Sequence, residues 1–452
     1  MAQAAAALPL SAGARVAIVG GGPAGSFFAL HLLRFARQVS LPLSVTIFER
    51  KDFSRRGQAG CNKCAGILSS RLLRGLGELG LHLPEHLIMG HLESYILHLA
   101  NEAIEIAQPD PARQIISVYR GAGPLHADLP PEVSFDAWLL AEARAAGTEV
   151  ISANVRRITA GSIMEIETEH RRQSFDLVVL ATGVNARLPD IAGLPYTPPR
   201  TEIMAQDELR LEMPLTAAEK RQVQVYVGQQ SGLLFGALIP KRELLNVSLL
   251  GHGLTHDAVG KFLQSPELQG RDGAATQRLC GCSPRIAVSS ARCSFADRFV
   301  AVGDAAVTRL YKDGIGSAFL TAQRAAWTAL HVGISRQAFA RGYEPFCRSI
   351  ALDNRVGRFL FWLWQQSQAR PHLARSWLRL LLAEKALPMP ERHGHRALWG
   401  LLTGDDSYVT IAHNLLHRGV LRALVDTFLP GGWSPKQQGH GAAKRGSFEE
   451  GL

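Results

Sequence analysis

Cysteine is scarce in this sequence, and long apolar runs are absent. Six cysteines among 452 residues are too few for a disulfide scaffold, so we expect a reducing, cytoplasmic location. No run of about 18 uncharged apolar residues occurs, so a membrane-spanning helix is not expected. Residues 1–14 lack the basic segment that begins a secretory signal, so none is predicted.

The composition is that of a globular protein with an excess of basic residues. Hydrophobic residues make up 46% and charged residues 19%, which excludes a mainly disordered, collagenous or coiled-coil chain. Lysine and arginine outnumber aspartate and glutamate by 49 to 39, a net charge of +10. This excess favours anionic partners such as phosphate-bearing cofactors or acidic lipid head groups. No nucleic-acid-binding motif accompanies it, so nucleic acid is not an expected partner.

A glycine-rich turn near the N-terminus predicts a dinucleotide site. The β-branched run of residues 15–20 leads into Gly20-x-Gly22-x-x-Gly25, after which a helix is expected. Such glycines permit a tight turn and let a pyrophosphate approach the N–H groups of the helix N-terminus. Glu49 follows 24 residues after Gly25, at the end of the next predicted strand, where it can bind the hydroxyls of a ribose.

Two further strand ends complete a characteristic order of motifs. The apolar run of residues 176–183 ends in Ala181-Thr182-Gly183, and residues 299–306 contain Gly303-Asp304. An aspartate at such a strand end can bind a polyol chain, and the following helix N-terminus can face an anion. Over roughly residues 14–335 the chain resembles the FAD-binding superfamily of aromatic hydroxylases and related reductases.

The resemblance implies an FAD site. In that superfamily the glycine turn and the acid bind the ADP half, the Ala-Thr-Gly segment passes near the cofactor, and the aspartate holds the ribityl chain. Carried over, the expected cofactor-binding residues of these motifs are Gly20, Gly22, Pro23, Ala24, Gly25, Glu49, Arg50, Ala181, Thr182, Gly183, Gly303 and Asp304.

A third set of segments resembles the geranylgeranyl reductase family, flavoenzymes that saturate isoprenoid double bonds. The loop Lys63-Cys64-Ala65-Gly66, the strand of residues 235–241, and the loop of residues 311–316 follow that family's layout. The resemblance implies contact with the cofactor through Lys63, Cys64, Arg120, Gly314, Ile315 and Gly316, with Cys64 at the reaction site. Its substrate strand maps to Phe235, Ala237, Ile239 and Pro240, although two bulky aromatics of the family strand are absent here.

Two side chains keep alternative interpretations. Lys312 is a candidate catalytic residue that would stabilise negative charge on the reduced flavin, and the alternative is a surface salt bridge with Asp313. The pair Cys61 and Cys64 could be redox-active or could fill small apolar spaces. The cysteine pairs 61/64 and 280/282 lie 216 residues apart, and no histidine flanks the first, so no metal site is predicted.

These signals predict an α/β protein. We expect a Rossmann-like FAD-binding domain with an inserted antiparallel β substrate domain and C-terminal helices. In the helix expected over residues 135–146, Asp136 and Glu142 should point outward. The expected divisions are 14–85, 119–190 and 293–335 for the FAD domain, 86–118 and 191–292 for the substrate domain, 336–430 for the helical segment, and 431–452 for a disordered tail.

The C-terminal segment has the composition of a helix at a membrane interface. Residues 358–364 and 377–382 interleave tryptophan, leucine and arginine. Peripheral membrane contact is therefore expected, and it would suit a lipophilic substrate. The alternative is that these helices pack back on the flavin domain.

The expected function is reduction of C=C bonds in a lipophilic, isoprenoid-like substrate by hydride from reduced flavin. One alternative is an FAD-dependent monooxygenase that hydroxylates a hydrophobic or aromatic substrate. Another is a flavin redox sensor without catalysis that acts through Cys61 and Cys64. Only one GxGxxG occurs, so NAD(P)H or a reduced electron-carrier protein would serve as a transient donor.

Overall fold

The computed structural model describes residues 8–99, 102–130, 132–228, 232–255, 257–269 and 275–426. The expected tail, residues 431–452, lies outside them. No helix in the described ranges combines the length and apolar character needed to cross a membrane.

A parallel sheet forms the centre of the first layer. Its strand order is β21-β22-β12-β1-β2-β8, and all neighbours except β21 run parallel. The strands are β1 (Arg15–Val19), β2 (Ser44–Glu49), β8 (Glu149–Ser152), β12 (Leu177–Leu180), β21 (Phe295–Ala296) and β22 (Phe299–Ala301). Leu177 to Leu180 are fully buried, as expected for a strand covered on both faces.

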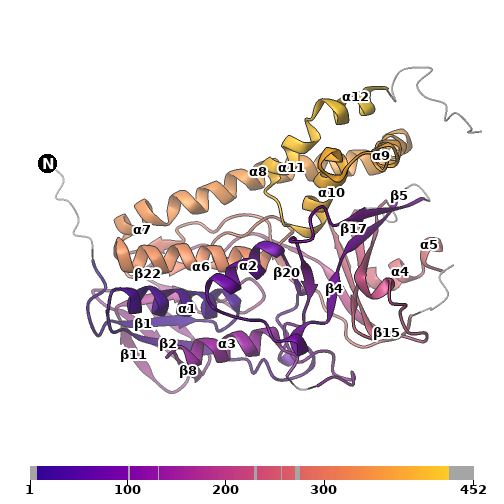
Figure 1. The fold of residues 1–452 in the computed structure, drawn as a ribbon. Coiled ribbons are helices and arrows are strands. Elements are labelled where there is room, and N and C mark those ends of the chain that lie inside the picture. The colour runs from indigo at the N-terminus through magenta and orange to yellow at the C-terminus, as the bar shows by residue number, and fades with distance from the viewer. Residues whose placement is uncertain are drawn as a thin grey trace, which may run out of the picture.

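Helices cover one face of this sheet, and a small sheet covers the other. The helices α1 (Pro23–Gln38), α3 (Phe135–Ala145) and α6 (Gly314–His331) lie together on one side (Figure 1). The second face packs on an antiparallel unit of β9 (Arg157–Thr159), β10 (Met164–Glu167) and β11 (Arg172–Phe175), extended by β13 (Asp190–Ala192). This arrangement is the predicted Rossmann-like layer, and the predicted fold class is confirmed.

A seven-stranded, mostly antiparallel sheet forms the second layer, at the opposite end from α7 (Figure 1). Its order is β19-β15-β18-β17-β16-β5-β6. The strands are β5 (Ser94–Leu99), β6 (Glu102–Ala107), β15 (Ala205–Leu211), β16 (Gln222–Tyr226), β17 (Leu233–Lys241), β18 (Leu244–Gly251) and β19 (Ala275–Arg278). The short helices α4 (Ala258–Leu263) and α5 (Pro266–Gln269) accompany it. The strands β5 and β6 form an antiparallel hairpin.

Two small sheets join the layers. One has the order β3-β7-β4 and consists of β3 (Ile67–Leu68), β4 (Gly90–Leu92) and β7 (Ile115–Ser117). The other pairs β14 (Thr201–Ile203) with β20 (Arg285–Ala287). β3 belongs to the expected FAD domain, and β4 and β7 belong to the expected substrate domain. The pairing of β3 with β7 therefore joins the two expected domains by hydrogen bonds. The division of the chain at these residue numbers stays a prediction.

The C-terminal part is helical, and it lies across both layers (Figure 1). The helices are α7 (Arg336–Gly342), α8 (Glu344–Ala369), α9 (Pro371–Glu384), α10 (His393–Thr403), α11 (Tyr408–Leu415) and α12 (Arg418–Asp426). Trp364 is buried and donates its indole N–H to the Leu234 carbonyl over 3.2 Å. Trp399 is fully buried and packs edge-on against Tyr95, with ring centroids 5.7 Å apart. These two tryptophans pack back on the seven-stranded sheet.

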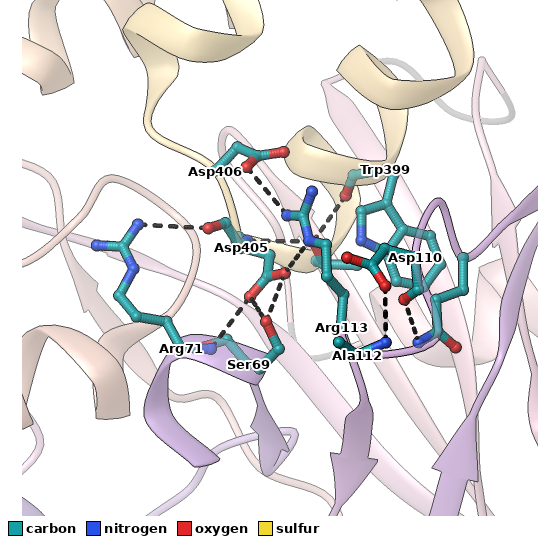
Figure 2. Close-up of polar contacts among 12 residues, drawn as sticks. Ser69, Arg71, Asp110, Ala112, Arg113, Trp399, Asp405 and Asp406 are labelled. Carbon is teal, nitrogen blue, oxygen red and sulfur yellow. Dashed lines mark hydrogen bonds and ion pairs between the residues drawn. The ribbon is translucent and has the colours of Figure 1, made fainter. Parts of the chain in front are cut away.

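A buried carboxylate ties this segment to the rest of the protein. Asp405, between α10 and α11, accepts a hydrogen bond from Ser70 Oγ over 2.8 Å and from Arg113 Nε over 2.7 Å (Figure 2). Ser70 begins α2 (Ser70–Glu78), and Arg113 lies between β6 and β7. Arg113 also contacts Asp406, with 3.0 Å between Nη2 and Oδ1. Three segments that are far apart in sequence therefore meet at one carboxylate.

Candidate active site

A cavity lies where the parallel sheet, the seven-stranded sheet and the C-terminal helices meet. It encloses about 2000 Å³, including its open mouth. Its walls run from the glycine turn after β1 to the inner face of β16 and β17, with Leu402 and Thr403 of α10 at the far side.

Backbone packing explains the glycine turn at one end. Gly20 has φ +108°, and a Cβ there would lie 2.6 Å from the Ala181 carbonyl oxygen. A Cβ on Gly25 would lie 1.9 Å from the Gly20 carbonyl oxygen, so only glycine lets α1 start this close to β1. Gly20 and Gly22 also line the cavity. The turn therefore aims the N-terminus of α1, with its N–H groups and partial positive charge, at the cavity.

Glu49 is held in place at the end of β2. Its carboxylate accepts hydrogen bonds from the backbone N–H of Gly21 over 2.7 Å and of Lys51 over 2.8 Å. These contacts join the acid to the glycine turn. Because each carboxylate oxygen has two lone pairs, both oxygens keep acceptor capacity toward the cavity that Glu49 lines.

Asp136 is buried, which corrects the expectation that it points outward. Arg120 Nη2 lies 2.9 Å from Asp136 Oδ2, and Asn62 also donates to this carboxylate. The Asp136 side chain has no exposed surface, and that of Arg120 is 10% exposed. This ion pair holds Arg120 on the cavity wall. The helical periodicity does not predict the burial of Asp136, because its partner Arg120 lies outside the helix.

Asp304 lines the cavity close to the glycine turn. It follows β22, and the neighbouring Gly303 packs so closely that a Cβ there would lie 2.7 Å from the Ala24 Cβ. Burial raises the pKa of the Asp304 carboxyl, and the charge of Arg120 acts in the opposite direction. The strand end therefore presents a carboxyl group to the cavity beside the start of α1.

The loop before α6 places Lys312 in the cavity. Tyr311 and Asp313 have φ values of +63° and +53°, so the loop winds tightly. Lys312 Nζ lies 4.0 Å from the centroid of the Phe235 ring. Burial, together with the charge of Arg309, lowers the pKa of Lys312 to about 7. Within the described chain Lys312 has no ion pair, so the proposed salt bridge with Asp313 does not form.

Asp313 caps helix α6 and does not pair with Lys312. Its carboxylate accepts from the Gly316 backbone N–H over 3.2 Å and from Ser69 Oγ over 3.1 Å, and it caps α6. Burial raises the pKa of Asp313 to about 6. Gly314 and Ile315 line the cavity, whereas Gly316, whose N–H bonds Asp313, does not.

One face of β17 forms the apolar wall. Phe235, Ala237 and Ile239 are buried and line the cavity, together with Val223 and Val225 of β16. Pro240 does not line it, which differs from the expectation. The reason is the two-residue repeat of a strand, which turns Pro240 away from the face that carries 235, 237 and 239.

The cysteines of the first loop are thiols. Cys64 lines the cavity, and its Sγ accepts from the Gly66 backbone N–H over 3.4 Å. Cys61 Sγ accepts from the Lys63 backbone N–H over 3.2 Å. Burial raises the pKa of Cys61, and it raises the pKa of Cys280 and Cys282 to about 12. Within the described ranges no group of cysteine, histidine and acidic side chains has a metal-binding arrangement.

The structure brings most of the predicted site residues to this one cavity. Gly25, Gly303 and Gly316 lie behind its wall, as does Pro240. The residues on the wall are Gly20, Gly22, Pro23, Ala24, Glu49, Arg50, Lys63, Cys64, Arg120, Ala181, Thr182, Gly183, Phe235, Ala237, Ile239, Asp304, Lys312, Gly314 and Ile315. Their individual roles stay predictions.

Sequence reasoning missed several polar wall residues. Asn185 and Arg187 follow the strand end at Gly183, and Arg285 comes from a segment without a motif. The first two could have been found, since the residues after a parallel strand gather at the ligand-binding edge of the sheet. Asn62 does not follow a parallel strand, so the sequence gives no sign that it lines the cavity. Its position depends on the loop that precedes Cys64.

Solved structures share this fold. No protein-family model matches the chain, and no curated protein matches its sequence. A geranylgeranyl bacteriochlorophyll reductase-like protein from Thermoplasma acidophilum is 16% identical, with a TM-score of 0.60 over 92% of this chain and 100% of that one. A flavoprotein/dehydrogenase from Cytophaga hutchinsonii is 15% identical, with a TM-score of 0.60 over 88% and 98%.

A third similar structure contains a ligand. It is a variant of the halogenase PltM in complex with FAD, 14% identical, with a TM-score of 0.57 over 90% of this chain and 87% of that one. At these identities the likeness establishes the fold. The predicted architecture, with its inserted sheet and C-terminal helices, is thereby one that proteins of several activities share.

The raised thiol pKa values predict slow alkylation. With iodoacetamide at pH 8, we expect the exposed Cys293 to react first and Cys61, Cys280 and Cys282 at least roughly tenfold more slowly, because the thiolate is the reactive form. Peptide mapping by mass spectrometry measures each rate, and Cys293→Ser should remove the fast phase. Rapid labelling of Cys61 would contradict this assignment and favour the redox-sensor alternative.

Proposed function

We propose that the protein is an FAD-dependent oxidoreductase that reduces a C=C bond of a lipophilic substrate. The observation that carries this proposal is the single cavity that joins the glycine turn, Glu49 and Asp304 to the apolar face of β17. One end has the donors and acceptors that a dinucleotide needs, and the other has the apolar surface that a lipophilic molecule needs.

The residues at the first end fit FAD. The N–H groups at the start of α1 suit its pyrophosphate, the Glu49 carboxylate suits the ribose hydroxyls, and the Asp304 carboxyl suits the ribityl chain. Arg120, paired with Asp136, places a fixed guanidinium group on the same wall. The similarity to a halogenase in complex with FAD supports this assignment. When bound, FAD supplies two-electron transfer.

The residues at the second end suit an apolar substrate. Phe235, Ala237 and Ile239 present aromatic and aliphatic surface, and Tyr95 adds a ring beneath α10. These side chains orient the substrate and exclude water from it. The similarity over nearly the whole chain to a geranylgeranyl bacteriochlorophyll reductase-like protein favours an isoprenoid-like substrate.

Reduction of a C=C bond adds a hydride to one carbon and a proton to the other. NAD(P)H or a reduced electron-carrier protein would supply the two electrons. Lys312 is placed to hold a proton, since its amine lies between the α6 loop and Phe235 and its pKa of about 7 makes either form accessible. Cys64 stands on the same wall as a second candidate catalytic residue.

The cofactor assignment predicts that Asp304→Ala lowers flavin retention. Loss of the carboxyl at the ribityl position should lower the flavin content of the purified protein at least about fivefold, the effect of losing one charge-assisted hydrogen bond. The absorbance ratio at 450 and 280 nm measures it. Asp190→Asn, which alters an exposed ion pair with Arg157, serves as the matched control. Unchanged flavin content in Asp304→Ala would contradict the proposed site.

The proposed C=C reductase activity predicts that substrate is reduced in the absence of oxygen. We expect the FAD-loaded protein, reduced anaerobically with dithionite, to convert a prenyl alcohol or ester into a product two mass units heavier per C=C bond. Liquid chromatography with mass spectrometry detects it, and heat-inactivated protein is the control. A product that forms only in air and gains an oxygen atom would instead indicate the monooxygenase.

We propose further that the outer face of α8 contacts an anionic lipid surface. Its exposed apolar side chains recur at the spacing of one helix face, and arginines lie among them. Phe359 and Trp362 stack with ring centroids 5.8 Å apart. The face consists of Leu352 (56% exposed), Arg355, Arg358, Phe359 (57%), Trp362 (51%) and Leu363 (38%). Apolar and basic side chains on one surface helix are typical of peripheral membrane contact.

This surface predicts binding to vesicles of phosphatidylglycerol and phosphatidylcholine. The double variant Phe359→Ser/Trp362→Ser should bind about tenfold or more weakly in a co-sedimentation assay, since two large apolar side chains leave the membrane. Trp327→Ser, on the exposed side of α6, should bind as the unaltered protein does. Equal binding of the double variant, or no binding of the unaltered protein, would contradict the proposal.

A further inference from the structure

Two polar side chains interrupt the apolar wall of the cavity. Gln206 of β15 and Ser248 of β18 both line it, and they are 4% and 3% exposed. Ser248 pairs with Gln206 on one neighbouring strand and with Ala237 of β17 on the other, so the three residues lie in one row across the sheet. The polar pair therefore lies directly beside the apolar face of β17.

A buried chain of hydrogen bonds leads from this pair into the protein. Gln206 Nε2 donates to Ser248 Oγ over 2.8 Å, and Ser248 Oγ donates to Asn246 Oδ1 over 2.7 Å. Asn246 Nδ2 in turn donates to Glu208 Oε1 over 2.9 Å. Glu208 Oε1 also lies 3.3 Å from Lys241 Nζ, and the two side chains are 9% and 1% exposed. The chain thus runs from the cavity wall to a buried ion pair.

The ion pair fixes the direction of the bonds in the chain. A carboxylate can only accept hydrogen bonds, so Asn246 turns its NH₂ group toward Glu208 and its carbonyl oxygen toward Ser248. Ser248 then donates its single proton to Asn246, and its oxygen can only accept from Gln206. The Gln206 amide is thereby held with its NH₂ group toward Ser248. Charges behind the wall consequently decide which donors and acceptors the wall presents.

One acceptor and one donor of this pair are left for a ligand. Ser248 Oγ has two lone pairs, and the bond from Gln206 uses one of them. Gln206 Nε2 carries two hydrogens, and among the contacts of the described residues the bond to Ser248 uses one. A hydroxyl group both donates and accepts, so it satisfies the two groups at once. An ether oxygen can only accept, and it leaves the Ser248 lone pair without a donor.

We propose that Gln206 and Ser248 bind a hydroxyl group of the substrate, which makes the substrate a lipophilic alcohol. The inference rests on the proposed function and narrows its substrate class. The hydroxyl group donates to Ser248 Oγ and accepts from Gln206 Nε2, while the apolar chain lies along the face of β17. A ligand that covers buried polar groups without bonding to them loses affinity, so the pair selects against molecules that lack the hydroxyl.

The test compares two ligands of one carbon skeleton, the prenyl alcohol farnesol and its methyl ether. Equilibrium dialysis against the FAD-loaded protein measures both dissociation constants, and it requires no turnover. We expect the alcohol to bind at least about tenfold more tightly than the ether, because the ether leaves the acceptor on Ser248 unpaired.

Ser248→Ala and Gln206→Leu each remove one partner of the hydroxyl group. We expect either variant to lower the preference for the alcohol over the ether at least about fivefold, because one of two hydrogen bonds is lost. The matched controls are Ser94→Ala and Gln222→Leu, which change the same residue types in the same sheet at positions that do not line the cavity. Both controls should keep the preference. Because the two test variants alter different strands, the comparison stays decisive if one of them does not fold.

Two outcomes would overturn the inference. One is the absence of a preference for farnesol over its ether in the unaltered protein, whether both ligands bind or neither does. The other is an unchanged preference in the test variants that fold. In either case the proposed function still stands if the dithionite-reduced protein adds two mass units to the ether as readily as to the alcohol. Failure to reduce either ligand, with the binding preference intact, would instead count against the proposed function.

Discussion

The architecture depends on one buried carboxylate, that of Asp405. A carboxylate removed from water needs compensating donors, and these come from two remote segments, Ser70 of α2 and Arg113 between β6 and β7. Arg309 adds a bond from the opposite side to the Gly404 carbonyl. The end of α10 is thereby fixed against both layers, which brings Leu402 and Thr403 to the cavity wall. The end of α10, which belongs to neither layer, therefore forms one side of the cavity.

At the end of the cavity where we propose that FAD binds, the constraint is steric. Gly20 and Gly25 let the first turn of α1 approach β1 and β12 so closely that any side chain would collide with backbone. Such a rigid turn positions the N–H groups of α1 before any ligand arrives. At the end where we propose that the substrate binds, the wall consists of side chains on one face of β17, where residues can vary in size without altering the backbone. This contrast is consistent with a fixed cofactor site and an adaptable substrate site on one scaffold.

Local patterns predicted what depends on local structure. The glycine turn, Glu49, Gly303 and Asp304 were identifiable because each stands at a fixed offset from a strand end, and such offsets carry the geometry with them. The orientation of Asp136 was mispredicted, because its partner Arg120 lies outside its helix. Pro240 was placed on the wall by analogy with a family motif, whereas the alternation of β17 excludes it. Long-range pairs such as Arg113 and Asp405 leave no mark in a single sequence.

The loop of residues 308–316 brings a charged side chain, and not backbone alone, to the cavity wall. A loop of glycines and proline would bring mainly backbone to the cavity. Here Tyr311 and Asp313 adopt left-handed backbone, Asp313 turns back to cap α6, and Lys312 is left on the wall above Phe235. The capping acid and the cavity lysine are adjacent in sequence and yet do not pair. Because the cap occupies the carboxylate, the lysine charge faces the cavity, where burial brings its pKa to about 7.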